Sequence, residues 1–186
     1  MTRIIVTAVR GQREAFLSYL QERLPHLEIV YDTTGDAWDT FMASLVLQGA
    51  DPAIHIEDDI LLTRDFISKS EAVIAERPQT MIQFFSMRQK DLTVGSRFDR
   101  KFCMNQCTDF PAGYNTQLLA FASTYVWNPG DRAPYDTMMD AWLRSRREAY
   151  WISVPSLVDH RIAKSLIDSR RSSKRQAFTF TDPDGE

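Results

Sequence analysis

The sequence contains little cysteine and no long apolar run, and both absences limit the class of protein. Its two cysteines, Cys103 and Cys107, are too few for a disulfide framework, and no second pair is present to complete a zinc site. We therefore expect free thiols in a reducing compartment. No apolar stretch approaches the roughly 20 residues needed to cross a bilayer. Residues 1–7 predict a strand rather than a signal peptide, so the expected location is the cytoplasm.

Internal repeats and interdomain linkers are also absent, and 186 residues suffice for one domain with a sizeable core. We expect that domain at 1–168, followed by a flexible tail at 169–186 that is first basic and then acidic. Residues 161–175 carry six Lys or Arg against the single acid Asp168, although the whole chain has a net charge of −3. Such a segment suggests an anionic partner near the C-terminus; the plainer interpretation is a solvated, disordered tail.

Segments with strand and helix patterns alternate along the chain. Apolar, β-branched runs predict strands at 3–9, 27–31, 53–60, 80–87, 102–110 and 150–154. Apolar positions at helical spacing predict helices at 13–24, 37–48, 64–77, 115–123 and 134–147, with Asp36 and Thr63 as N-caps. Segment 89–101 is expected to be a surface loop or hairpin. The opening strand–helix–strand unit implies parallel strands joined by a right-handed crossover, so the sequence predicts an α/β fold.

Three consecutive acids stand at the end of the third predicted strand. A short apolar segment delivers Glu57, Asp58 and Asp59, and the chain turns apolar again at Ile60. Adjacent carboxylates repel one another, and burying them is costly without a compensating cation. Acids at the C-terminal end of a strand in an open α/β sheet are typical of a site for a hard divalent cation and a phosphorylated ligand. The plainer alternative is a solvated acidic turn.

The residues that leave the first strand are expected to line a nucleoside pocket, because ligands of open α/β sheets bind beyond the C-terminal ends of the strands. These residues are Thr7, Ala8, Val9 and Arg10. Arg10 is alternatively a plain surface charge.

The order of motifs over residues 3 to about 167 resembles that of GT-A-type glycosyltransferases, a metal-dependent nucleotide-sugar family. The family's DxD-type acidic motif corresponds to 57–59 and its glycine-containing loop to Pro111-Ala112-Gly113. The acid that begins a late helix corresponds to Asp136, and the C-terminal histidine to His160. The resemblance implies a single-domain GT-A-like fold, with a Rossmann-type, mostly parallel sheet flanked by helices.

The resemblance further implies transfer of a sugar from a nucleoside-diphosphate sugar, with UDP as the expected nucleotide, to a hydroxyl acceptor. Glu57, Asp59 and His160 would hold Mn²⁺ or Mg²⁺, and a histidine ligand favours manganese because imidazole is a softer donor. The plainer interpretation of His160 is a capping or core residue. The other residues expected to contact the donor are Asp58, Gly113, Lys164 and Ser165.

An inverting transfer needs a general base, and Asp136 is the first candidate. Asp140 lies four residues later on the same face of the predicted helix and is the second candidate. An acid at the start of a helix also stabilises the helix through its macrodipole, with no catalytic role.

Segments 54–66, 83–97 and 155–175 are also similar to small glycosyltransferases of tailed bacteriophages. Some relatives in that group are associated with sugar attachment to hydroxymethylated pyrimidines in DNA. The resemblance implies a DNA acceptor in a host cytoplasm. The residues expected to contact the phosphate backbone are Arg170, Arg171, Lys174 and Arg175.

Several alternatives stay open. The acceptor could be a surface glycan or a protein instead of DNA. A nucleotidyltransferase shares the fold and the metal-binding acids, but its glycine-rich loop after the first strand corresponds here to 9–13, which has one glycine, Gly11. A non-catalytic nucleic-acid-binding module would use the basic tail and leave 57–59 without a role. The sequence does not determine the sugar, the nucleotide, the stereochemistry or the oligomeric state.

Overall fold

The computed structural model describes residues 2–127, 134–163, 166 and 175–184. Within these ranges the chain forms, in order, β1 (Arg3–Val9), α1 (Glu14–Arg23), β2 (Glu28–Asp32), α2 (Ala37–Gln48), β3 (Ala53–Glu57), β4 (Ile60–Leu62), α3 (Phe66–Glu76), β5 (Ile82–Gln83), α4 (Asp91–Val94), β6 (Arg97–Asp99), β7 (Cys107–Phe110), α5 (Tyr114–Ala122), α6 (Pro134–Ser145), β8 (Tyr150–Ile152) and β9 (Val158–His160). Among the described residues, no helix is both long enough and apolar enough to cross a membrane.

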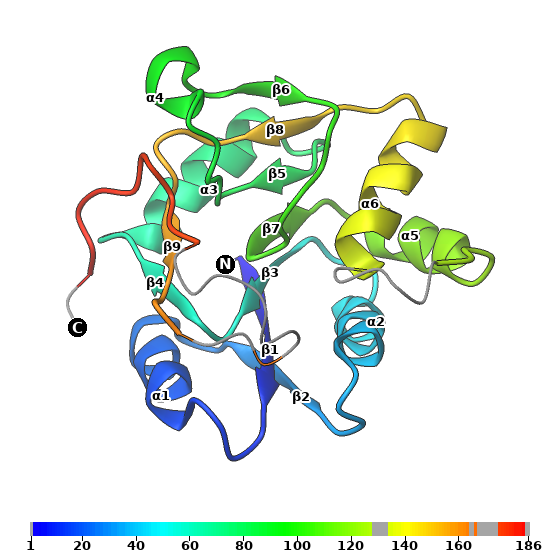
Figure 1. The fold of residues 1–186 in the computed structure, drawn as a ribbon, viewed down its shortest axis with the longest axis horizontal. Helices are drawn as coiled ribbons and strands as arrows, with labels where there is room; N and C mark the ends of the chain where they lie inside the picture. The colour runs from blue at the N-terminus through cyan, green and yellow to red at the C-terminus, as the bar shows by residue number, and fades with distance from the viewer. Residues whose placement is uncertain (1, 128–133, 164–165, 167–174, 185–186) are drawn as a thin grey trace.

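The main sheet has seven strands in the order β2-β1-β3-β7-β5-β8-β6 (Figure 1). β1 pairs in parallel with β2 and β3, and β5 pairs in parallel with β8. Only β7 and β6 run against their neighbours, so five of the seven strands share one direction. The predicted α/β fold with a mostly parallel sheet is confirmed. The reversed direction of β6 and β7 was not predicted, because local sequence patterns do not show strand direction.

Helices cover both faces of this sheet, with α1 and α3 on one face and α2, α5 and α6 on the other (Figure 1). Neighbouring residues of a strand point to opposite faces. Ile54 and Ile56 of β3 therefore join the core beneath α1 and α3, whereas His55 between them contacts the rings of Phe41 and Phe110 in the second core. Side chains on both faces of β3 are buried, which explains why its first four residues, Ala-Ile-His-Ile, are mostly apolar.

A second sheet consists of β4 and β9, which pair antiparallel. The pairing places Ile60 opposite His160, so the residue after the acidic turn lies beside the end of β9. This register joins two parts of the chain that are about 100 residues apart in sequence. It fixes the position of His160 relative to 57–59.

The end of the chain packs along this second sheet. The backbone N–H of Asp184 donates to the carbonyl of Leu62 at 2.9 Å. Ala177 is buried, and its N–H donates to Oδ1 of Asp159 at 2.6 Å. The prediction of a flexible tail from 169 onward is therefore wrong for 175–184, while 169–174 lie outside the described residues. Local patterns miss this packing because the partners are strands far away in sequence.

The helix caps follow the sequence in one case and differ from it in another. Asp36 caps α2, since its Oδ1 accepts the N–H of Trp38 at 2.8 Å. Thr63 does not cap α3; its hydroxyl donates to the carbonyls of Thr181 and Asp182, at 3.3 Å each, and α3 begins three residues later. The hydroxyl is used by the C-terminal segment instead of by the helix.

The predicted strands at 80–87 and 102–110 shorten to β5 and β7, and the segment 89–101 contains α4 and β6. Side-chain contacts replace strand pairing next to these strands. The amide of Gln83, for example, donates to the carbonyl of Cys103 at 2.7 Å. The predicted strands were too long because residues buried in loops are as apolar as residues in strands.

Asp109 of β7 provides a test of the core. Its side chain is 2 % exposed, β7 pairs it with Ile54 and Ile82, and burial raises its pKa to about 7. A carboxyl group whose folded pKa exceeds its unfolded value costs stability as the pH rises between the two values. Relative to the parent protein, Asp109→Asn should therefore gain roughly 2–4 kcal/mol of unfolding free energy between pH 4 and pH 8.

Urea unfolding of both proteins at pH 4, 6 and 8 measures this difference. The exposed Asp51→Asn variant is the matched control, and its difference from the parent protein should not grow with pH in this way. A constant difference between Asp109→Asn and the parent protein would contradict a protonated, buried Asp109.

Candidate metal and nucleotide site

The three acids lie where β3 leaves the main sheet. Glu57 is the last residue of β3, and Asp58 and Asp59 form the turn into β4. The backbone N–H of Arg161 donates to the carbonyl of Asp59 at 2.8 Å, which continues the β4–β9 pairing past His160. Strand pairing alone thus brings the acids and His160 together at the C-terminal edge of the parallel strands.

Glu57, Asp59 and His160 present one ligand atom each, and these atoms all lie within 4.8 Å of one another. Nε2 of His160 is 3.2 Å from Oδ2 of Asp59, and both side chains are almost completely buried. Oδ1 of Asp59 is buried without a hydrogen-bond partner among the described residues. Two carboxylates and an imidazole at this spacing are a donor set that fits a divalent cation.

The two ring nitrogens of His160 have different partners. Nδ1 lies 2.6 Å from the carbonyl of Arg161, which can only accept. Nε2 lies 2.6 Å from Nη2 of Arg175 and 3.2 Å from Oδ2 of Asp59, so it faces one donor and one acceptor. A backbone carbonyl that holds the far nitrogen is the usual support of a metal-binding histidine. The carbonyl of Arg161 thus orients the ring with Nε2 toward Asp59.

Two guanidinium groups balance the charge of the acids. Nη1 of Arg13 lies 2.9 Å from Oδ1 of Asp58 and 2.7 Å from Oδ2 of Asp59. Arg175 reaches the same cluster through His160. Arg13 comes from the loop after β1, and Arg175 from the C-terminal segment. The site therefore combines cation ligands with two groups that bind anions well.

Glu57 has its own environment. It accepts a hydrogen bond from the hydroxyl of Tyr135 at 3.0 Å, and Nε2 of Gln106 lies 3.5 Å from its other oxygen. Burial, followed by the negative charges of Asp59 and Asp136, raises the pKa of Glu57 to about 8. A cation that binds beside such a carboxyl group favours its ionised form and so lowers its pKa.

The two candidate bases both hold the loop that precedes β7. Oδ1 of Asp136 accepts the N–H of Asn105 at 3.0 Å, and Oδ1 of Asp140 accepts the N–H of Phe102 at 2.8 Å. Asp136 is close enough to Glu57 to influence its pKa, whereas Asp140 is buried and paired with Arg144. Of the two, only Asp136 adjoins the acid cluster.

Three of the four residues predicted to line a nucleoside pocket lie against the acidic turn. The hydroxyl of Thr7 donates to the carbonyl of Ile56 at 3.5 Å, and the N–H of Val9 lies 3.4 Å from Oδ2 of Asp58. Ala8, between them, is buried. Arg10 is exposed, with its guanidinium 4.6 Å from the centre of the Tyr31 ring. The recorded contact of Arg10 is therefore with β2, and not with the acid cluster.

Gly113 does not join this group. β7 runs antiparallel to β3 and places Phe110 opposite Ala53, so the loop after β7 lies at the opposite edge of the sheet from Glu57. The reversed strand is the reason for the difference. Five other predicted residues lie outside the described ranges: Lys164, Ser165, Arg170, Arg171 and Lys174.

Arg13, Tyr135 and Gln106 were not predicted from the sequence, and Arg175 was predicted to bind nucleic acid. Arg13 could have been found, because it lies in the loop after β1 and the same strand-end rule applies to it. Tyr135 directly precedes Asp136, which was predicted. Gln106 has no local signal, since its position depends on the reversed strand β7.

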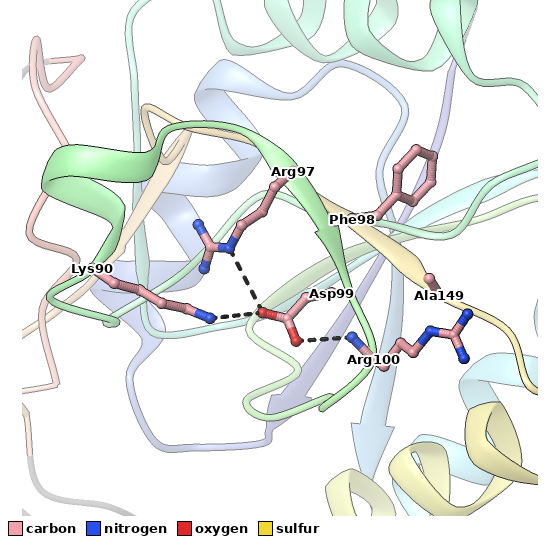
Figure 2. A pocket seen from close by; sticks show the side chains of 6 residues that line it. All are labelled: Lys90, Arg97, Phe98, Asp99, Arg100 and Ala149. Atoms are coloured by element: carbon pink, nitrogen blue, oxygen red, sulfur yellow. Dashed lines mark hydrogen bonds and ion pairs between the residues drawn. The ribbon is translucent and has the colours of Figure 1, made fainter.

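A separate hollow of about 530 Å³ lies at the edge strand β6, lined by Lys90, Arg97, Phe98, Asp99, Arg100 and Ala149. Figure 2 shows Lys90 and Arg97 converging on Asp99, at 3.1 Å and 3.7 Å. β6 is at the far end of the sheet from β1 and β2. The hollow is not part of the acid cluster.

No protein-family model matches the chain, and no curated protein matches its sequence. The chain is similar to the crystal structure of apo UDP-glucose pyrophosphorylase, with 9% identity and a TM-score of 0.48, over 81% of this chain and 72% of that one. It is also similar to a putative glucose-1-phosphate thymidylyltransferase from Bacillus anthracis in complex with a sucrose. That comparison gives 9% identity and a TM-score of 0.48, over 86% of this chain and 70% of that one.

The main functional prediction from the sequence, a glycosyltransferase that modifies DNA, is wrong on this comparison. Both structures carry the names of nucleotidyltransferases, the class that the sequence analysis kept as an alternative.

The metal cluster can be tested by direct binding. If Glu57, Asp59 and His160 hold one ion, Asp59→Asn and His160→Gln should each lower Mn²⁺ affinity by at least the roughly 10–100-fold that loss of a supporting group costs. Isothermal titration with Mn²⁺ measures the affinity. Glu76→Gln, an exposed acid of α3, is the control and should bind Mn²⁺ as the parent protein does. Equal affinities in all four proteins would exclude this cluster as the metal site.

Proposed function

We propose that the protein is a divalent-cation-dependent nucleotidyltransferase that joins a sugar phosphate to a nucleoside monophosphate taken from a nucleoside triphosphate. The observation that carries the proposal is the cluster of Glu57, Asp59 and His160 flanked by the guanidinium groups of Arg13 and Arg175. The same cluster places ligands for a cation and donors for phosphate oxygens at one edge of the sheet. That combination suits chemistry at a polyphosphate.

The donor set fits Mn²⁺ or Mg²⁺, and the imidazole favours manganese. When bound, such an ion neutralises negative charge that develops on a transferring phosphoryl group. Oδ1 of Asp59 has no hydrogen-bond partner among the described residues, which agrees with a position kept for a ligand. The contact between Nδ1 of His160 and the carbonyl of Arg161 orients the ring so that Nε2 faces Asp59.

Arg13 and Arg175 are the proposed anion-binding groups. Both contact the ligand atoms of the cluster, Arg13 at Asp59 and Arg175 at His160. Guanidinium groups donate to phosphate oxygens in a bidentate manner, so these two side chains can turn from the acids to a bound triphosphate. The loop after β1 has only one glycine, which the sequence analysis counted against a nucleotidyltransferase. Arg13 nevertheless supplies the basic residue that such a loop normally carries.

The reaction needs no general base from the protein. An oxygen of the sugar phosphate is already ionised near pH 7, since the second pKa of a phosphate monoester is about 6. That oxygen would attack the α-phosphorus of the triphosphate, and the bond from the α-phosphorus to the bridging oxygen would break. Pyrophosphate leaves with the electron pair, and a nucleoside-diphosphate sugar forms. Asp136 and Asp140 hold backbone N–H groups of the loop before β7, which agrees with this absence of a base.

Pyrophosphate release tests the proposal. With Mn²⁺, a panel of nucleoside triphosphates and a panel of sugar 1-phosphates, we expect release that requires both substrates and stops with EDTA. Arg13→Gln should lower turnover by about 10²–10³-fold, the usual cost of losing a charged donor to a transition state. Asp136→Asn should stay within about tenfold of the parent protein, because its amide oxygen can still accept the Asn105 N–H.

The outcomes separate the mechanisms. A loss of about 10²-fold or more in Asp136→Asn, with substrate binding intact, would indicate a general base and contradict the proposed reaction. Pyrophosphate release that Arg13→Gln leaves unchanged would exclude Arg13 from the site. Absence of release from every substrate pair, with Mn²⁺ bound, would overturn the nucleotidyltransferase.

A further inference from the structure

Three aromatic side chains form a shelf beside the acid cluster. Trp38, in the first turn of α2, stacks with Tyr125 and Trp127, which follow α5 in the chain. The ring centres are 6.5 Å and 6.2 Å apart, and the planes are nearly parallel, at 16° and 17°. All three side chains are partly exposed, and Val126 between the last two is 92 % exposed. We call these three residues the aromatic shelf.

The shelf lies at the same edge of the sheet as the acids. β2 runs parallel to β1, and α2 begins five residues after β2 ends, so Trp38 lies at the C-terminal edge of these strands. Phe41, one helical turn after Trp38, has its ring centre 5.2 Å from that of Tyr135. The hydroxyl of Tyr135 donates to Glu57 at 3.0 Å. One ring contact and one hydrogen bond therefore connect Phe41, which follows Trp38 on α2, to the proposed metal ligand Glu57.

The local charge decides which ligand the shelf fits. In the segments that carry it, 36–41 and 121–127, the charged residues are the exposed acids Asp36 and Asp39. Negative charge disfavours a phosphate group at the shelf, and the phosphate-binding arginines lie at the acid cluster instead. Carboxylates accept hydrogen bonds from hydroxyl groups, and flat aromatic faces cover the C–H face of a sugar ring. A neutral, hydroxyl-rich ring satisfies both features.

We propose that the aromatic shelf is a subsite for the ring of a neutral hexose, with Asp39 as an acceptor for its hydroxyl groups. The proposal that a sugar ring binds here is argued from the aromatic shelf and its charges alone. Its identity as the sugar part of the sugar phosphate rests on the proposed function. In that case the phosphate of the same molecule extends along Tyr135 toward Arg13 and Arg175, and the shelf contributes sugar specificity.

Saturation-transfer NMR with D-glucose, D-galactose and N-acetylglucosamine tests the subsite on the full chain. We expect transfer to the ring C–H protons of at least one sugar. Trp38→Ala and Trp127→Ala should each weaken that sugar's binding by about tenfold, the usual order for loss of one aromatic contact. Trp38→Phe keeps an aromatic face and should retain more of the binding, which guards against an effect of misfolding in the alanine variants.

Two controls separate this proposal from the proposed function. Phe98→Ala removes a ring that is 57 % exposed on β6, at the far end of the sheet, and should leave sugar binding unchanged. Glu76→Gln removes an exposed acid of α3 and should also bind the sugar as well as the parent protein does. If the parent protein binds the sugar but catalyses no nucleotidyl transfer, the shelf stands and the proposed function fails.

Three results would overturn the shelf. No saturation transfer to any of the three sugars would exclude a hexose subsite. Equal binding in Trp38→Ala and the parent protein would place the sugar elsewhere. Transfer to the base protons of uridine or thymidine that is lost in Trp38→Ala, without transfer to a hexose, would assign the shelf to a nucleobase.

Discussion

The structure depends on compensating three adjacent carboxylates at the point where β3 leaves the main sheet. Asp58 and Asp59 are buried, and burial of neighbouring acids is unfavourable unless positive charge or hydrogen bonds offset it. The chain offsets it from three distant segments: the loop after β1 supplies Arg13, β9 supplies His160, and the C-terminal segment supplies Arg175. The convergence of these segments also explains why β4 pairs with β9 and why 175–184 packs along the second sheet.

The same compensation links the fold to the chemistry. Arginine side chains balance part of the negative charge of the acids, and a divalent cation would balance it more compactly. An ion at Asp59 and His160 would therefore free the two guanidinium groups for an anionic ligand. A site in which cation and anion binding depend on each other suits a metal–triphosphate substrate, because that substrate brings both charges together.

Much of the site was predictable because its residues are marked by local pattern. An apolar strand followed by three acids identifies 57–59, and Asp36 precedes a clear helical period and does cap α2. The pairing of Asp59 with His160 followed from a family resemblance, and strand register then placed them together. Gly113 was misplaced because nothing in a four-residue strand tells whether it runs parallel or antiparallel. Arg175 was assigned to nucleic-acid binding within a basic tail, because its contact with His160 depends on tertiary packing.

We propose that Glu57, Asp59 and His160 hold one divalent ion that a nucleoside triphosphate then shares. A crystal structure of the protein with Mn²⁺ and a non-hydrolysable triphosphate analogue, with an anomalous difference map to locate manganese, would show whether they do. We expect one strong anomalous peak roughly 2.0–2.6 Å from an oxygen of each acid, next to Nε2 of His160, with Arg13 and Arg175 on the phosphates. A manganese peak away from these three residues, or phosphates bound without contact to either arginine, would contradict it.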